Sequence, residues 1–258
     1  MRTTAIMNLK GGTGKTVTTV NAAAILAEIH GRRVLAVDAD SQANLTELLT
    51  RSPASDSHAG LSLLLRGLQA RAMNSKIKNV DLLPADETLM ALDISSAGNG
   101  KADPMALANW LQQKKTRYEH VLIDCPPAFS AGAMAALIAA DDVVIPLKLD
   151  AFGIRGLANL MEQIKNMRRV NPDLVIAGVL PTMYYPDEMQ HKAEDDLRKS
   201  LELAGVRCFH HVRRSVRMDG STFAQEPLTK YSPKSKTCYE YKLFVRDLLA
   251  MGGDDDEL

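Results

Sequence analysis

The sequence has few cysteines, few aromatic residues and no excess of charge of either sign. Its three cysteines, Cys125, Cys208 and Cys238, lie far apart and form no Cys-x-x-Cys pair, so neither a zinc site nor a disulfide framework is indicated. Aromatic residues make up 5% of the 258 residues, too few for the base-stacking platforms of RNA-binding modules. Lys and Arg match Asp and Glu at 31 each, which argues against coating nucleic acid by bulk charge but allows a local basic patch.

Long apolar runs and a targeting segment are also missing. No stretch reaches the roughly 18 uninterrupted apolar residues that suggest a membrane span. Residues 1–4, Met-Arg-Thr-Thr, lead straight into a strand-like segment with no signal-peptide pattern. We therefore expect a cytoplasmic protein that has no membrane partner. What is present is a 46% share of hydrophobic residues, enough to bury a sizeable core.

Short apolar runs alternate with longer helical periods along the chain. The runs hold four to seven residues rich in Val, Ile and Leu, which is typical of strands buried on both faces. They cover residues 4–8, 33–38, 80–83, 121–124, 143–146 and 174–180. The helical periods cover residues 15–29, 153–169, 187–204 and 238–250, with a further possible helix at 61–71. This alternation predicts one doubly wound α/β domain with a mainly parallel sheet over residues 1–251, followed by a disordered acidic tail at 252–258.

A glycine-rich segment, Lys-Gly-Gly-Thr-Gly-Lys-Thr at residues 10–16, connects the first predicted strand to the first predicted helix. Its glycines let successive backbone N–H groups point at phosphate oxygens, and the helix N-terminus adds its positive dipole end. Lys15 supplies a charge for the β- and γ-phosphates, and the Thr16 hydroxyl can coordinate Mg²⁺. The segment predicts a P-loop NTPase. Its predicted nucleotide contacts are Gly11, Gly12, Thr13, Gly14, Lys15 and Thr16.

Two further apolar strands end in carboxylates at the edge of the predicted sheet where the phosphate loop lies. Residues 121–123 lead to Asp124, which we expect to hold Mg²⁺ through water. Residues 34–37 lead to Asp38 and Asp40, two positions apart. This pair could hold the water shell of Mg²⁺ or orient the attacking water. For Asp38 the alternative is that it caps the next helix.

The pattern K-G-G-x-G-K-T resembles the deviant Walker A motif of the ParA/MinD superfamily of ATPases. There the additional lysine, here Lys10, reaches across a nucleotide-sandwich dimer to the phosphates of the other subunit; the alternative is a solvated lysine. Residues 40–46 resemble the family's switch I, which makes Asp40 its hydrolysis-promoting aspartate, although Ser41 stands where the family usually has Pro. Residues 124–127, Asp-Cys-Pro-Pro, resemble switch II.

The same resemblance implies an ATP-dependent homodimer with ATP and Mg²⁺ as cofactors. The catalytic residues that it implies are Lys10, Lys15 and Asp40. The Mg²⁺ ligands that it implies are Thr16, Asp40 and Asp124. It also places the adenine pocket near Thr182 and Met183. Lys10 and Val17 are the further nucleotide contacts that the resemblance implies. Val17 stands where the family usually has a second threonine; its backbone N–H can still meet the α-phosphate, but the hydroxyl contact is lost, which predicts modestly weaker nucleotide binding.

Two late basic segments resemble ParA partition ATPases in particular. Residues 212–217, Val-Arg-Arg-Ser-Val-Arg, and 231–236, Tyr-Ser-Pro-Lys-Ser-Lys, lie in stretches that contain no acid. Such segments could form a phosphate-contacting patch, which would bind DNA without reading its sequence. The alternative is a pair of solvated basic loops, and the family's Glu-Ala-Pro is replaced here by residues 220–222, Gly-Ser-Thr. The expected DNA contacts are Arg214, Arg217, Lys234 and Lys236.

The resemblance implies a weak ATPase that a ParB-like centromere-binding protein stimulates. It would associate with the nucleoid when ATP is bound and position plasmid, chromosomal or mobile-element DNA. One alternative is a positioning ATPase for a protein cargo or a membrane machine, and another is a nucleotide-regulated binding module that barely hydrolyses ATP. The acidic end of the chain argues against a MinD-type membrane helix, and the cysteine pattern argues against cluster-binding relatives.

Overall fold

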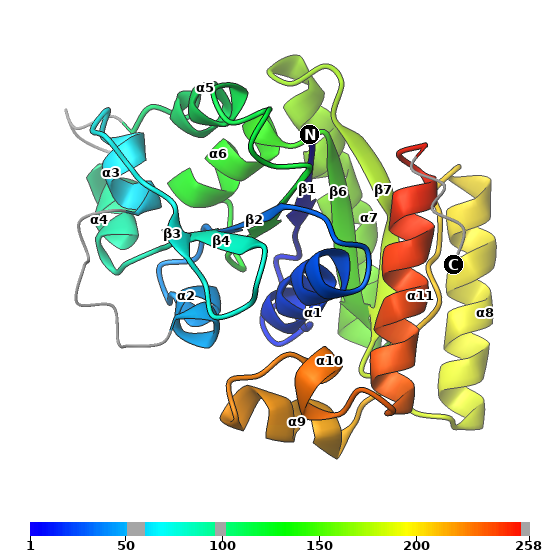
Figure 1. Ribbon diagram of the computed structural model, residues 1–258. Coiled ribbons are helices and arrows are strands. Elements are labelled where there is room, and N and C mark those ends of the chain that lie inside the picture. Colours follow the sequence, from blue (N-terminus) through cyan, green and yellow to red (C-terminus); the bar gives the residue numbers. More distant parts are fainter. Residues whose placement is uncertain (51–59, 96–101, 254–258) are drawn as a thin grey trace.

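The computed structural model describes residues 1–50, 60–95 and 102–253, and these form a seven-stranded sheet covered on both faces (Figure 1). The strands follow the order β3-β4-β2-β5-β1-β6-β7, and all neighbours are parallel except β3 and β4. The predicted doubly wound fold is confirmed. The strands are β1 (Arg2–Ile6), β2 (Val34–Asp38), β3 (Met73–Asn74), β4 (Val80–Leu83), β5 (His120–Asp124), β6 (Asp142–Lys148) and β7 (Val175–Thr182).

Helices form a layer on each face of this sheet, and each layer has its own apolar core. Figure 1 shows α1 and α11 side by side in front of the sheet and α7 behind it. On the front face lie α1 (Lys15–Glu28), α2 (Asn44–Leu49), α9 (Val216–Phe223), α10 (Leu228–Tyr231) and α11 (Lys236–Ala250). On the other face lie α3 (Leu61–Leu65), α4 (Thr88–Ser95), α5 (Ala106–Gln112), α6 (Ala131–Ala139), α7 (Ala151–Asn166), followed by a 3₁₀ turn (Met167–Arg169), and α8 (Glu188–Leu203).

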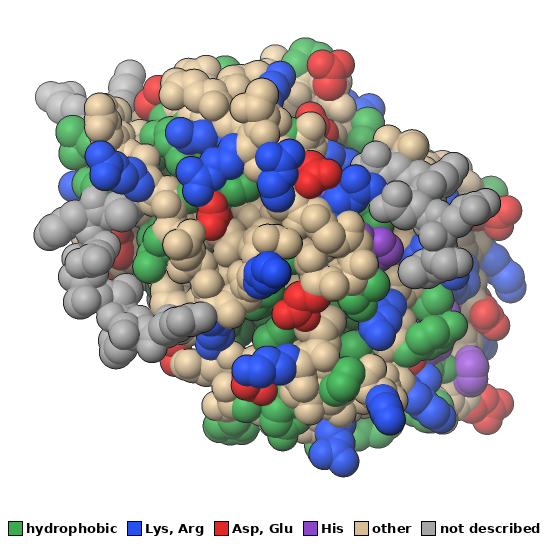
Figure 2. All heavy atoms as spheres, viewed as in Figure 1, with side chains coloured by type: hydrophobic (Ala, Val, Ile, Leu, Met, Phe, Trp, Pro, Cys, Tyr) green, Lys and Arg blue, Asp and Glu red, His purple; other side chains and the backbone are tan. Residues whose placement is uncertain are grey.

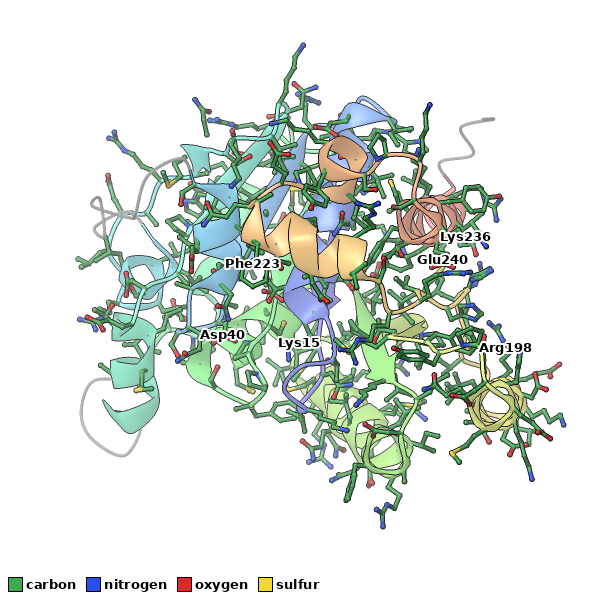
Figure 3. All side chains as sticks on the ribbon, turned by 90° about the horizontal axis from the view of Figure 1, so that it is seen from below. Lys15, Asp40, Arg198, Phe223, Lys236 and Glu240 are labelled. Carbon is green, nitrogen blue, oxygen red and sulfur yellow. The ribbon has the colours of Figure 1, made fainter. Side chains whose placement is uncertain are left out.

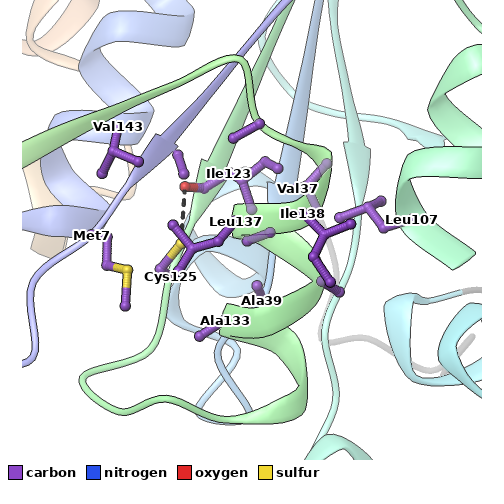
Figure 4. Close-up of a cluster of buried hydrophobic side chains, with 14 of the residues drawn as sticks. Met7, Val37, Ala39, Leu107, Ile123, Cys125, Ala133, Leu137, Ile138 and Val143 are labelled. Atoms are coloured by element: carbon purple, nitrogen blue, oxygen red, sulfur yellow. Dashed lines mark hydrogen bonds between the residues drawn. The ribbon is translucent and has the colours of Figure 1, made fainter. Parts of the chain in front are cut away.

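The central strands are buried along their whole length because both helical layers cover them, as their continuous Val, Leu and Ile composition predicts. Figure 4 shows part of the core beneath α6, where Met7, Ile123 and Cys125 lie with Ala133 and Leu137. The three cysteines are free thiols, and burial raises the pKa of each, which makes them unreactive packing residues.

The four long predicted helices are present, but several details differ from the sequence-based expectations. The helix expected at 61–71 ends at Leu65, because Gly67 takes a left-handed φ of 77° that stops it. The apolar periodicity of α7 and α8 predicts that Ile154 and Met189 lie on the same stripe as the buried leucines of their helices, but Ile154 is 38% and Met189 is 81% exposed. Of the predicted acidic tail, residues 252–253 form a turn, and residues 254–258 lie outside the described residues. Residues 51–59 also lie outside the described residues.

Candidate nucleotide-binding site

The phosphate loop follows β1, which lies between β5 and β6 near the middle of the sheet. Gly12 and Gly14 have φ angles of 69° and 83°, which a residue with a Cβ adopts only at a cost. Gly14 is the N-cap of α1, so the loop's amides and the positive end of the helix share one concave surface. This is the strand–loop–helix arrangement that a phosphate loop requires.

A cavity of about 460 Å³ opens over the loop. Residues 11–17 form its base, and Asp40 and Pro127 bring the two acidic segments to its rim. Figure 3 looks onto this edge of the sheet, where Lys15 and Asp40 lie close to α9. The cavity therefore joins the loop to the segment after β2 and the segment after β5.

The far side of this cavity comes from residues that the sequence did not single out. Glu47 and Leu48 of α2 and Thr222 of α9 line it. Neither Thr182 nor Met183, expected near the adenine, belongs to this lining. Thr182 is buried, and its Oγ1 donates to the carbonyl oxygen of Thr13 at 2.9 Å, so Thr182 supports the loop from behind.

Lys15 is the cation at the base of the cavity. Its side chain is buried, and its Nζ donates to the carbonyl oxygen of Lys10 at 3.3 Å. Burial lowers the pKa of this ammonium, and Asp124, Cys125 and Asp40 oppose that shift. A bound triphosphate would supply the counter-charge that this buried cation needs, which fits a phosphate ligand.

Asp124 has the properties of a metal-linked carboxylate. It is buried, and its Oδ1 has no hydrogen-bond partner in the part of the chain that the structure describes. Burial, together with the nearby charge of Asp38, raises its pKa well above the usual range, while a hydrogen bond from the Thr16 side chain opposes the shift. A hard divalent cation would satisfy the unpartnered oxygen and favour the ionised form. The oxygens of Thr16, Asp40 and Asp124 therefore fit Mg²⁺.

The two acids after β2 have different surroundings. Asp38 is fully buried, and its Oδ2 accepts from both the backbone N–H and the hydroxyl of Thr46 at 2.8 Å. Burial raises its pKa to about 6. Because Thr46 lies in the first turn of α2, Asp38 caps that helix, which is the alternative considered for this residue. Asp40 is half-buried at the cavity rim, and its Oδ1 accepts from the N–H of Gln42 at 3.0 Å.

Lys10 does not line the cavity that opens over the phosphate loop. Its Nζ donates to both carboxylate oxygens of Asp150 at 2.7 and 2.8 Å and lies 5.7 Å from the centre of the Phe152 ring. Asp150 is the N-cap of α7 and accepts from the N–H of Gly153. Partial burial opposes ionisation of Asp150, but hydrogen bonds from Lys10 and Gly153 outweigh it and lower the pKa to about 2. Lys10 is thus paired with the start of α7.

The late basic segments are exposed near α9 and α11. Arg214, Arg217, Lys234 and Lys236 are all exposed. Arg213 differs, because its guanidinium pairs with the buried carboxylate of Glu240. Figure 2 shows basic side chains spread over this part of the surface among apolar ones, and Figure 3 places Lys236 at the start of α11.

The Gly-Ser-Thr segment at residues 220–222, which departs from the family's pattern, packs closely in this structure. A Cβ at Gly220 would lie 2.3 Å from the hydroxyl of Tyr231, so this tyrosine fills the space that a side chain would need. The glycine therefore brings α9 and α10 together at the side of the cavity where Thr222 lies.

A phosphate loop after a central parallel strand, with a buried acid at the end of the neighbouring strand, is the arrangement of a P-loop ATPase. A family model described as an AAA domain matches residues 1–176. The chromosome-partitioning ATPase Soj of Thermus thermophilus is 32% identical, over 97% of this chain and 96% of its own. The chain belongs to this AAA domain family and to the ParA/MinD superfamily, as a ParA/Soj-type ATPase.

Solved structures agree with this assignment. Cobyrinic acid a,c-diamide synthase from Mycobacterium smegmatis, with a bound ATP analog and magnesium, is 28% identical with a TM-score of 0.83, covering 100% of this chain and 98% of its own. MinD from Pyrococcus horikoshii, complexed with Mg-ADP, is 25% identical with a TM-score of 0.78, covering 100% and 99%. The nucleotides and magnesium bound in these neighbours are consistent with the predicted cofactors of this chain, ATP and Mg²⁺. Within the described ranges, no helix has both the length and the apolar character to cross a membrane.

Proposed function

We propose that this ATPase is an ATP-switched DNA-positioning protein. It dimerises across the phosphate loops when ATP and Mg²⁺ are bound, binds DNA nonspecifically in that state, and associates with the nucleoid. It hydrolyses ATP slowly until a ParB-like centromere-binding protein stimulates it. The cycle would position plasmid, chromosomal or mobile-element DNA.

The position of Lys10 is the observation that carries this proposal. Its ammonium is next to the phosphate loop but outside the cavity that the loop forms, and its side chain is 35% exposed. A lysine that lies outside the lining of this cavity, in a sequence pattern of dimerising ATPases, supports a contact with phosphates bound by a second subunit.

The other proposed roles follow from the geometry of the cavity. Lys15 and the loop amides bind the phosphates, and Asp40, at the half-buried rim, orients the attacking water. Thr16 and Asp124 hold Mg²⁺, which neutralises charge on the phosphates when it is bound. Thr182 supports the nucleotide site indirectly, through its hydrogen bond to the backbone of the phosphate loop. Met183 follows Thr182 at the end of β7.

DNA binding is proposed for the exposed basic residues at the starts of α9 and α11. In a dimer the patches of two subunits add, so more phosphates are contacted at once and affinity rises. The four contacts are Arg214, Arg217, Lys234 and Lys236, and they would be salt-sensitive and indifferent to sequence.

Retention of random-sequence DNA, measured over a range of salt concentrations with ATP, ADP or no nucleotide, tests the proposal. We expect retention only with ATP, and a loss of about tenfold or more when both Arg217→Glu and Lys236→Glu are introduced, because two phosphate contacts become repulsive. Lys199→Glu on α8 reverses one charge, as each of these two substitutions does, at an exposed site away from the patch and should retain DNA. Equal retention without ATP, or retention in the double variant, would contradict the proposal.

The similarity to MinD favours one second candidate, a positioning ATPase for a protein cargo or a membrane machine. This candidate uses the same nucleotide switch and needs no DNA. An ATP-dependent dimer that retains no DNA at any salt concentration would support it.

A further inference from the structure

Asn21 is a buried polar residue in the middle of α1, and its side chain contacts three other residues. It is 2% exposed. Its Nδ2 donates to the carbonyl oxygen of Val17 at 2.8 Å, and its Oδ1 accepts from the backbone N–H of Leu228 at 2.8 Å. Nδ2 also lies 3.9 Å from Sδ of Met218, a weak acceptor. The side chain therefore joins the helix that follows the phosphate loop to both α9 and α10.

The bond from Leu228 caps α10 from outside that helix. The N-cap residue, Pro227, makes no side-chain cap hydrogen bond, so the N–H of Leu228 needs another acceptor. Asn21 supplies this acceptor, although it lies 207 positions away in the sequence. Because a buried N–H without an acceptor is costly, the bond fixes the start of α10 against α1. Figure 1 shows α10 packed between α1 and α9.

The neighbouring helix α9 connects the nucleotide cavity to the basic surface. Thr222 of this helix lines the cavity that opens over the phosphate loop. Arg217, in the first turn of the same helix, is exposed and is one of the expected DNA contacts. A change in the position or order of α9 would therefore reach the nucleotide and the DNA contacts together.

The packing of α9 is loose. Of its eight residues only Ser221 is buried, and Val216 and Phe223 at its two ends are 81% and 91% exposed. Gln225, just after the helix, has a left-handed φ of 50°, which is unfavourable for a residue with a Cβ. A short helix with little buried apolar surface belongs to the part of a fold that opens most easily. Its contacts with neighbouring elements therefore decide how well α9 is ordered.

Two connections would hold α9 to α1 when a nucleotide is bound. The first is present without nucleotide and runs from Asn21 to Met218 and to the adjoining α10. The second forms only when a nucleotide fills the cavity, because residues 11–17 lie at its base and Thr222 lies on its far side. A short helix can pivot about one connection, whereas two connections at different turns restrict it.

We propose that Asn21 is a positioning residue through which ATP bound at the phosphate loop orders α9 and, with it, Arg217. Asn21 holds the helix against α1, and the nucleotide adds the second connection. Conformational entropy of α9 is then lost when ATP binds, and DNA binding no longer has to remove it. The consequence for DNA rests on the proposed function, whereas the ordering of α9 by ATP requires no DNA.

Hydrogen exchange of the full chain, followed by mass spectrometry, tests the ordering without DNA. Exchange in residues 10–17 and 215–232 is compared with and without a nonhydrolysable ATP analogue and Mg²⁺. In the wild-type chain we expect the analogue to slow exchange in both segments, by about tenfold in 215–232. In Asn21→Leu, which has a similar volume and no polar group, residues 10–17 should still be slowed, but the slowing of 215–232 should be lost.

Asn21→Ser is a second, milder variant with the same expected result. Its hydroxyl can still bond to the carbonyl oxygen of Val17 within α1, but it is too short to replace the bond to Leu228. Urea unfolding of each variant shows that the chain is folded where exchange is measured.

Thr18→Val is the matched control. Thr18 is also fully buried in α1, and its Oγ1 lies 3.2 Å from the hydroxyl of Tyr241 on α11. The change therefore also removes a buried hydrogen bond between α1 and a late helix, but that helix is α11. We expect the analogue to slow exchange in residues 215–232 of this variant as it does in the wild-type chain.

The proposal is overturned if the analogue leaves residues 215–232 of the wild-type chain unchanged, if their slowing survives in both Asn21 variants, or if Thr18→Val abolishes it as well. It is also overturned if the Asn21 variants no longer dimerise with ATP in light scattering, because the slowing would then come from the second subunit. Ordering of α9 in a wild-type chain that retains no DNA would contradict the proposed function alone. Equal ATP-dependent DNA retention by the wild-type chain and the Asn21 variants would contradict this proposal alone.

Discussion

Lys10 and Asp150 form a partly exposed ion pair, with 35% and 28% of their side chains accessible. A pair of this kind contributes only about 0–1 kcal/mol, because water and salt screen it. A weak bond is suitable here, since the proposed function requires Lys10 to leave Asp150 and reach phosphates bound by another subunit. The pair therefore opposes dimerisation slightly without preventing it.

Asp150→Asn tests this interpretation at the residue scale. Asparagine keeps the N-cap of α7 but removes the negative charge, so Lys10 is released while the helix remains capped. ATP-dependent dimerisation should shift to lower protein concentration by up to about fivefold, the equivalent of about 1 kcal/mol. The measurement is light scattering over a dilution series with ATP and Mg²⁺.

Asp187→Asn is the matched control for this change. Asp187 is the N-cap of α8 and accepts from the N–H of Gln190 at 2.8 Å, but no lysine is paired with it among the described residues. Its substitution should leave dimerisation unchanged. If the two variants behave alike, the ion pair of Lys10 has no part in dimerisation.

At the scale of elements, the contact of α6 with the segment after β2 positions the acids. A Cβ at Gly132 of α6 would lie 2.3 Å from the carbonyl oxygen of Ala39, the residue between Asp38 and Asp40. The N–H of Ala39 in turn donates to the carbonyl oxygen of Asp124 at 2.9 Å. The missing side chain of Gly132 thus allows α6 to press on the backbone that places both acidic segments.

Gly132→Ala should therefore destabilise the fold by about 1–3 kcal/mol, because a backbone atom has to move. Gly156→Ala is the control, since Gly156 lies inside α7 and a Cβ there meets nothing within 4 Å. That change should stabilise the protein by about 0.5–1 kcal/mol through helix propensity. Urea unfolding of both variants measures the difference, and equal effects would contradict the close contact of α6.

The short helices show where sequence patterns stop being informative. The phosphate loop, Asp40 and Asp124 could be found from the sequence because each follows an apolar strand at a fixed spacing. By contrast, α2 begins after Ala43, which offers no side-chain cap, and the cap comes from Asp38, outside the helix. Likewise the position of α9 against α10 involves the close packing of Tyr231 on Gly220, a contact between separate helices. Glu47, Leu48 and Thr222 lie on these helices, so the far side of the cavity could not be predicted.

At the scale of the whole molecule, the order of strands brings the site together. β1 lies beside β5, and β5 lies beside β2, so Ile6, Asp124 and Asp38 end their strands in register. The sequence predicted that the phosphate loop and both acidic segments lie at this edge of the sheet, because parallel strands place their carboxyl ends together. It could not predict that Lys10 would be paired with Asp150, because that contact joins the loop to α7, 140 positions further along the chain.

Asp40→Ala tests the complete switch, since a dimer that cannot hydrolyse ATP should persist. If Asp40 orients the attacking water, its loss should lower turnover about a hundredfold or more while ATP still binds and Thr16 and Asp124 still hold Mg²⁺. Light scattering should then show a stable dimer with ATP and none without nucleotide. Lys10→Ala combined with Asp40→Ala should remain monomeric with ATP, because the bound nucleotide is present but the lysine that joins two subunits is missing. A dimer in the double variant would remove Lys10 from the interface, and unchanged turnover in the single variant would remove Asp40 from catalysis, so the two roles are tested independently.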